Sequence, residues 1–166
     1  MADDFDKFIQ EHSQEQQGRE KLSQETKPEW AVLKGLVSRF ALDGKEFSGH
    51  KFEWAPYAAS RSEFLRLNDV AVIFLDQGER NGVPLNCRVR FTRRPLEPGR
   101  MWVDNEAPLE PLEWSLEPQI EGENLVWSVP KLGATLSSAN LAEKIAIELS
   151  KYHAAYEKAY GRWSAA

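Results

Sequence analysis

Cysteine is almost absent from this chain, which has one, Cys87, among 166 residues. A single cysteine cannot form an internal disulfide, and it cannot supply the close cysteine pairs of a structural zinc site. This absence excludes a disulfide-stapled secreted scaffold and favours a reducing compartment. We therefore expect a cytoplasmic protein.

Long apolar runs are also missing. The longest uncharged apolar stretch, residues 70–75, has six residues, whereas a helix that spans a bilayer needs about 20. The chain starts Met-Ala-Asp-Asp-Phe-Asp, which is acidic where a secretory signal is basic. We expect no membrane span and no export signal.

Basic charge is in deficit, with 21 lysines and arginines against 26 acidic residues and a net charge of −5. A negatively charged protein repels a phosphate backbone at long range. The balance therefore disfavours a nucleic-acid partner.

Catalytic and cofactor-binding motifs are missing as well. The chain has no phosphate-binding glycine loop, dinucleotide fingerprint, serine nucleophile elbow, paired-histidine zinc helix or EF-hand loop. Its three histidines, His12, His50 and His153, are scattered along the sequence. These absences lower the expectation of an enzyme, and they predict neither a cofactor nor a metal ion.

Residues 1–27 form a polar, acidic segment with few apolar side chains. Such a composition cannot bury a face of its own, which predicts an arm that is disordered or only partly helical. Phe5, Phe8 and Ile9 would share one side of a short helix, which suits docking on the body or on a partner.

Residues 28–166 are predicted to form a single globular α+β domain. Helical spacing of apolar side chains predicts a first helix over Pro28–Leu42, with Thr26 as its cap and Asp43-Gly44 as its end. From Glu46 the period changes to two, and short segments between turn residues predict antiparallel strands. The predicted strands are 46–54, 64–67, 70–76, 85–92, 100–104, 112–117 and 124–129.

A long amphipathic helix is predicted over Ser138–Tyr160, with Ser137, Ser138 and Asn140 as alternative caps and Gly161 as its end. Its stripe consists of Leu141, Ile145, Leu149, Tyr152, Tyr156 and Tyr160. The element order predicts a two-layer α+β sandwich. In it, a mostly antiparallel sheet of about six strands is packed by this helix and the shorter N-terminal one.

Alternation within the strands predicts which side chains face the core. Cys87 should point inward with Leu85, Val89 and Phe91, which favours an inert core thiol over a nucleophile. A two-residue turn at Gly122-Glu123 would bring the apolar faces of the last two strands to one side. Those faces consist of Leu112, Trp114 and Leu116, and of Leu125, Trp127 and Val129.

Arginines are concentrated ahead of an acidic segment. An exposed arginine patch would bind a carboxylate or phosphate group, or an acidic partner. The other interpretation is internal, with the arginines paired to acidic side chains of residues 104–123 on a neighbouring strand. The candidate residues are Arg88, Arg90, Arg93 and Arg94.

Aromatic side chains and histidines indicate two further sites. His50, beside Lys51 and Glu53, is a candidate general base, with a packed or surface histidine as the alternative. A cavity between the sheet and the last helix would bind a small ligand, although the same side chains suit a packed core. That cavity would be lined by Tyr152, His153, Tyr156, Tyr160, Trp114 and Trp127.

The sequence leaves three functions open. Missing motifs, segregated charge and the polar arm favour a non-enzymatic cytosolic domain that binds a protein partner. The first alternative is a small-ligand carrier or sensor. The second is an enzyme that uses His50 or His153 with nearby carboxylates.

Overall fold

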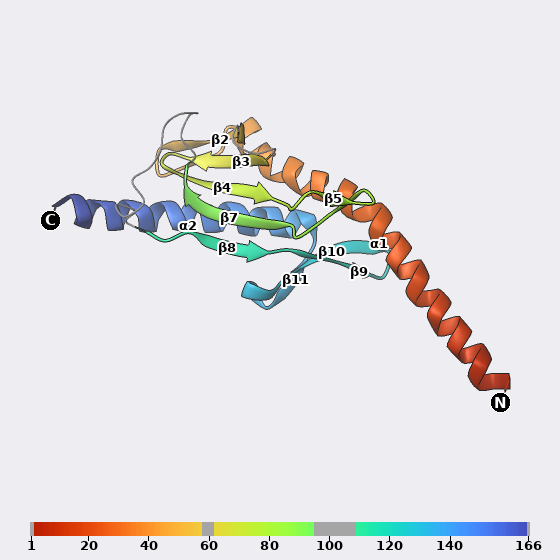
Figure 1. The fold of residues 1–166 in the computed structure, drawn as a ribbon. Coiled ribbons are helices and arrows are strands. Elements are labelled where there is room, and N and C mark those ends of the chain that lie inside the picture. The colour runs from red at the N-terminus through yellow and green to blue at the C-terminus, as the bar shows by residue number, and fades with distance from the viewer. Residues whose placement is uncertain (1, 58–61, 95–108, 166) are drawn as a thin grey trace.

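The computed structural model describes residues 2–57, 62–94 and 109–165. Two long helices, α1 (Ala2–Leu42) and α2 (Ser138–Ala165), precede and follow a series of strands (Figure 1). The strands are β1 (Glu46–Phe47), β2 (His50–Tyr57), β3 (Ser62–Leu67), β4 (Val70–Leu75), β5 (Glu79–Arg80), β6 (Val83–Pro84), β7 (Arg88–Arg93), β8 (Leu112–Ser115), β9 (Glu117–Glu121), β10 (Asn124–Val129) and β11 (Ala134–Leu136). A 3-10 turn, η2 (Pro130–Leu132), connects β10 to β11.

Six strands form the main sheet in the order β1-β2-β3-β4-β7-β8, and every pair of neighbours is antiparallel. A second sheet has the order β11-β10-β9, and β5 and β6 form a separate hairpin. The predicted α+β sandwich with an antiparallel sheet and two helices is confirmed.

The core lies where both helices meet one face of the main sheet. Leu33 and Val37 of α1 are completely buried, as are Val72 and Phe91 of the sheet. From α2 the side chains of Leu141, Ile145 and Leu149 are completely buried. Burying each of these side chains contributes about 1.5 to 3 kcal/mol, so packing holds the two helices on the sheet.

The first helix is much longer than predicted. The expected start at Pro28 is wrong, because α1 begins at Ala2 and runs through Pro28. Thr26 is not a cap: its hydroxyl donates to the carbonyl of Leu22 at 2.6 Å, a bond within the helix. A proline inside a helix costs about 3 kcal/mol. Two features offset this cost: the residues before Pro28 include many glutamines, glutamates, lysines and arginines, which favour helix, and the burial of Trp30 fixes the turn that follows.

The N-terminal half of α1 projects away from the body (Figure 1). The whole helix has 41 residues, which corresponds to about 60 Å at a rise of 1.5 Å per residue. Residues 3–20 are all exposed. The predicted polar arm is therefore an exposed helix, and it continues without a break into the helix of the core.

Residues with positive φ alter two of the predicted strands. Ser48 and Gly49 adopt positive φ and divide the predicted strand 46–54 into β1 and β2. Asn86 has φ 50° and interrupts the alternation there, so Leu85 is exposed, not inward, while Cys87, Val89 and Phe91 are buried as predicted. The predicted strand 100–104 lies outside the described residues.

The predicted strand 112–117 ends at Ser115, and the chain continues into β9 of the second sheet. Pro118 has no N–H for a ladder, and it lies in β9, an edge strand where proline is tolerated. The turn at Gly122-Glu123 is confirmed, but β10 pairs with β9 and does not join the sheet that contains β8.

The C-terminal helix follows most of its prediction. The Ser137 hydroxyl accepts from the N–H of Asn140 at 3.2 Å, which identifies Ser137 as the cap. The expected end at Gly161 is wrong, since α2 continues to Ala165; a glycine costs only about 1 kcal/mol within a helix. Tyr160 is exposed, unlike the rest of the predicted stripe. Within the described ranges, no helix is both long and apolar enough to cross a membrane.

Candidate functional site

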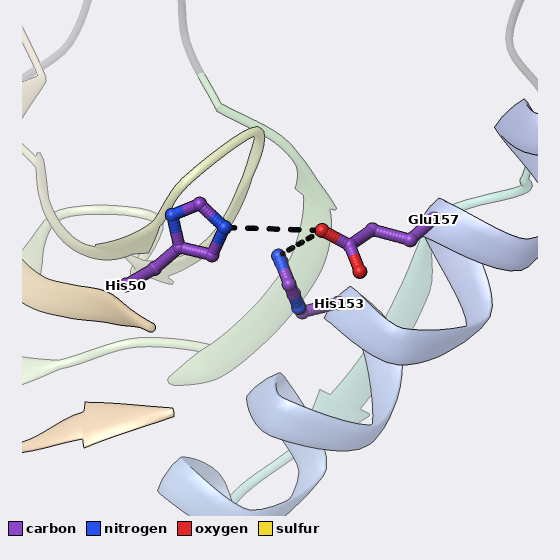
Figure 2. A group of neighbouring side chains, drawn as sticks. All are labelled: His50, His153 and Glu157. Carbon is purple, nitrogen blue, oxygen red and sulfur yellow. Dashed lines mark ion pairs between the residues drawn. The ribbon is translucent and has the colours of Figure 1, made fainter. Parts of the chain in front are cut away.

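Two histidines and a glutamate that are far apart in the sequence meet between β2 and α2. Figure 2 shows His50 and His153 directed at the same carboxylate oxygen of Glu157. That oxygen, Oε1, lies 3.2 Å from His153 Nε2 and 3.9 Å from His50 Nε2. One ligand atom from each of the three side chains lies within 4.8 Å of the other two.

Local structure explains how each side chain reaches the cluster. His153 and Glu157 are four residues apart on α2 and therefore share a face of the helix. His50 begins β2 directly after the turn at Ser48 and Gly49, opposite Phe47 of β1. Phe47 packs its ring edge-on against His153, with centroids 6.1 Å apart, which holds this hairpin on α2.

His153 is the buried member of the cluster. Its side chain is almost completely inaccessible, and neither ring nitrogen forms a hydrogen bond within the described part of the chain. Burial lowers the pKa of His153, and the nearby His50 lowers it further, whereas Glu157 and Asp69 oppose the shift. The lowered pKa favours the neutral imidazole, which is the form that binds a metal ion, and its Nε2 lies 3.2 Å from Glu157 Oε1.

Buried polar atoms without hydrogen bonds are uncommon, and a bound ion or water is one of their explanations. A tetrahedral zinc ion, bound at about 2.0 to 2.2 Å, holds its ligand atoms about 3.4 Å apart. The spacing of 3.2 Å from His153 Nε2 to Glu157 Oε1 fits this value. His50 Nε2 lies 3.9 Å from the same oxygen, and the three ligand atoms lie within 4.8 Å of one another, so His50 must move inward to bind the same ion. The His50 and Glu157 side chains are 39% and 49% exposed, so both can adjust.

The three histidines are scattered along the sequence, but two of them meet in the fold. His12 lies on the exposed arm of α1, stacked on Phe8 with ring centroids 6.2 Å apart, while the fold brings His50 and His153 to within 5.3 Å of each other. Glu157 was missed altogether. A histidine followed four residues later by glutamate on a predicted helix was the available signal, because that spacing places two ligands on one face.

The aromatic residues proposed for a ligand site lie mainly in the core. Trp114 and Trp127 are buried, and the Trp127 N–H donates to the Ser138 hydroxyl at 3.0 Å. Tyr152 is also buried, and its hydroxyl donates to the carbonyl of Glu110 at 2.9 Å. Burial raises the pKa of Tyr152 to about 12. Tyr160 lies outside the core and stacks on Tyr156.

The four arginines do not form one patch. Arg88 and Arg90 share the outer face of β7, where Arg88 pairs with Glu113 of β8 at 3.0 Å, as the internal interpretation predicted. These two residues line a polar cavity of about 560 Å³ with Glu113 and Glu117. Arg94 follows β7 and lies 4.0 Å from Asp69. Arg93 lies on the opposite face from Arg88 and Arg90 because side chains alternate along the strand.

Cys87 is buried next to the polar cavity, and burial raises the pKa of its thiol to about 12. A thiol with such a pKa has almost no thiolate at neutral pH, which supports the prediction that it is inert.

No family model, no curated protein and no solved structure matches this chain.

Proposed function

We propose that this chain is a cytoplasmic metal-binding protein that holds one divalent transition-metal ion, zinc foremost, between His50, His153 and Glu157. The supporting observation is the buried imidazole of His153, whose nitrogens have no hydrogen bond beside a second imidazole and a carboxylate. A metal ion would give this imidazole a ligand bond in place of the hydrogen bond that it does not form.

The ligand types favour zinc and its neighbours over magnesium or calcium. Imidazole suits zinc, copper, nickel and cobalt, whereas magnesium and calcium prefer oxygen ligands alone. Three protein ligands leave the fourth tetrahedral position for water or another molecule, which is the arrangement of open sites and not of closed structural ones. The His50 and Glu157 side chains are 39% and 49% exposed, which favours an open position that faces solvent.

Calorimetric titration of zinc into the full chain, after treatment with a chelator, tests this proposal. We expect one ion per chain. His50→Ala and Glu157→Gln should each weaken zinc binding at least about 100-fold, because loss of even an outer-shell partner costs about 10- to 100-fold. Both side chains are partly exposed, so these variants should fold normally.

His12→Ala is the matched control, since it removes an exposed histidine of the arm. Cobalt should give the visible absorption of a tetrahedral site in the wild type and the control only. Unchanged zinc affinity in both ligand variants would refute the site.

A second candidate function, protein interaction through the arm, rests on a separate observation. Phe5, Phe8 and Ile9 at the tip of α1 are 63%, 63% and 49% exposed. Helices in proteins draw most of their stability from tertiary packing, which this exposed segment lacks, so contact with another molecule would stabilise it.

The partner that we propose for the tip of α1 is a second copy of this chain, because the purified protein alone is enough to test it. Sedimentation equilibrium should then show an association that weakens with dilution, and replacing Phe5, Phe8 and Ile9 by serine should abolish it. Val32→Ser, an exposed apolar side chain nearer the body, is the control. A wild-type chain that stays monomeric at every concentration would rule out self-association.

A further inference from the structure

An apolar cavity of about 330 Å³ lies beside the proposed metal site, between the end of α1, the β1–β2 hairpin and α2. Its apolar lining comes from Phe40, Phe47, Phe52, Ala146 and Ile147. Phe47 and Ile147 are substantially exposed, so their apolar surfaces remain in contact with water. A volume of this size is at the lower end of the range for small-molecule sites.

Phe47 connects the cavity to the metal site. It lines the cavity, its ring contacts His153 edge-on, and it pairs with His50 across the hairpin. Residues opposite each other in an antiparallel pair have Cβ atoms about 5 Å apart. On α2 the lining residue Ser150 precedes His153 by three positions, which is about 4.5 Å along the helix axis. None of the three proposed ligands lines the cavity, but Phe47 and Ser150 bring its lining close to His50 and His153.

We propose that the cavity and the metal together bind a small monocarboxylate with an apolar chain. This inference rests on the proposed metal function. The carboxylate would occupy the open coordination position, where a cation attracts an anionic oxygen ligand. The chain would lie along Phe47, Phe52 and Ile147, where binding removes apolar surface from water.

Lys45, Glu46 and Glu143 also line the cavity. The two glutamates repel a carboxylate, whereas Lys45 offers it a position that competes with the metal ion. An ion pair at this exposed lysine would need no metal, and exposed pairs are weak. Dependence on zinc therefore separates the proposed arrangement from simple attraction to Lys45.

Octanoate is the probe, titrated calorimetrically into the full chain without metal and with one equivalent of zinc. We expect octanoate to bind the zinc form at least about tenfold more tightly than the metal-free form, because the open cation adds a ligand interaction. Octanol, which has the apolar chain without the carboxylate, should bind with the same affinity whether or not zinc is present. Acetate, which has the carboxylate without the chain, should bind much more weakly than octanoate.

Ile147→Glu should weaken octanoate binding to the zinc form at least about tenfold, since it brings a charge to the apolar wall. Val32→Glu makes the same kind of change on the exposed side of α1, outside this cavity, and should leave binding unchanged. Equal octanoate affinity with and without zinc, or no binding to the zinc form, would overturn the inference while the metal site stands. Failure to bind zinc would overturn both.

Discussion

Replacing Leu149 by alanine is expected to lower the free energy of unfolding by about 2 to 5 kcal/mol, the usual range for a buried leucine. Leu149 is completely buried on the inner face of α2, within the cluster of core side chains that both helices share with the sheet. Truncation would remove apolar contact and leave a cavity that close-packed neighbours fill only in part. Urea unfolding followed by circular dichroism measures the change.

Ile147→Ala provides the matched control on the same helix. Ile147 lies two residues earlier, points away from the core and is 51% exposed. Its truncation should change stability by no more than about 0.5 kcal/mol, as is usual for surface positions. A similar small loss at Leu149 would contradict the packing of α2 described above.

Local periodicity predicted the faces of the elements well. Leu141, Ile145 and Leu149 recur at helical spacing, and all three are buried. Alternation likewise predicted the burial of Cys87, which directly precedes β7, and of Val89 within β7. These predictions succeeded for one reason. Burial of one face of a helix or strand sets the spacing of its apolar residues, and that spacing can be read from residues close together in the sequence.

Conformational exceptions were harder to predict. Proline usually marks the start of a helix, yet Pro28 lies inside α1 because helix-favouring residues before it and core packing after it continue the same helix. Asn86 at positive φ reversed the expected orientation of Leu85. In each case a single residue departs from the average behaviour of its type, and only the surrounding structure fixes the outcome.

The candidate metal site depends on tertiary contacts that the sequence pattern does not contain. His50 and His153 come from opposite ends of the folded region, and they meet only because the β1–β2 hairpin packs on α2 through Phe47. Periodicity describes each element separately, so it identified His153 and His50 as single candidates. It could not indicate that they, with Glu157, form one group.

Acidification is expected to destabilise the metal-free protein through His153. Its pKa is lowered in the folded chain relative to the ordinary value of 6.5, mainly by burial, although Glu157 and Asp69 oppose the shift and His50 adds to it. The unfolded chain therefore binds a proton at a higher pH than the folded chain does. The stability due to neutral His153 is fully present above pH 6.5 and is lost as the pH falls toward the folded pKa.

One such proton changes the free energy of unfolding by at most about 1.4 kcal/mol per pH unit. Urea unfolding between pH 8 and pH 5 measures this loss. His153→Leu should remove the part of it that begins near pH 6.5, and it should not destabilise the neutral protein strongly, since an apolar side chain leaves no buried nitrogen without a partner. His12→Leu on the exposed arm should leave the pH dependence unchanged.

Zinc binding provides a second test of His153, in which the side chain should raise the stability of the protein. A ligand that binds only the folded state at 100 times its dissociation constant stabilises that state by about 2.7 kcal/mol. Because zinc requires neutral imidazoles, this gain should shrink as the pH falls and should be absent in His153→Leu. A zinc-dependent stabilisation that persists in His153→Leu would place the ion elsewhere on the chain. A pH dependence that survives in the same variant would show that His153 is not the group that titrates.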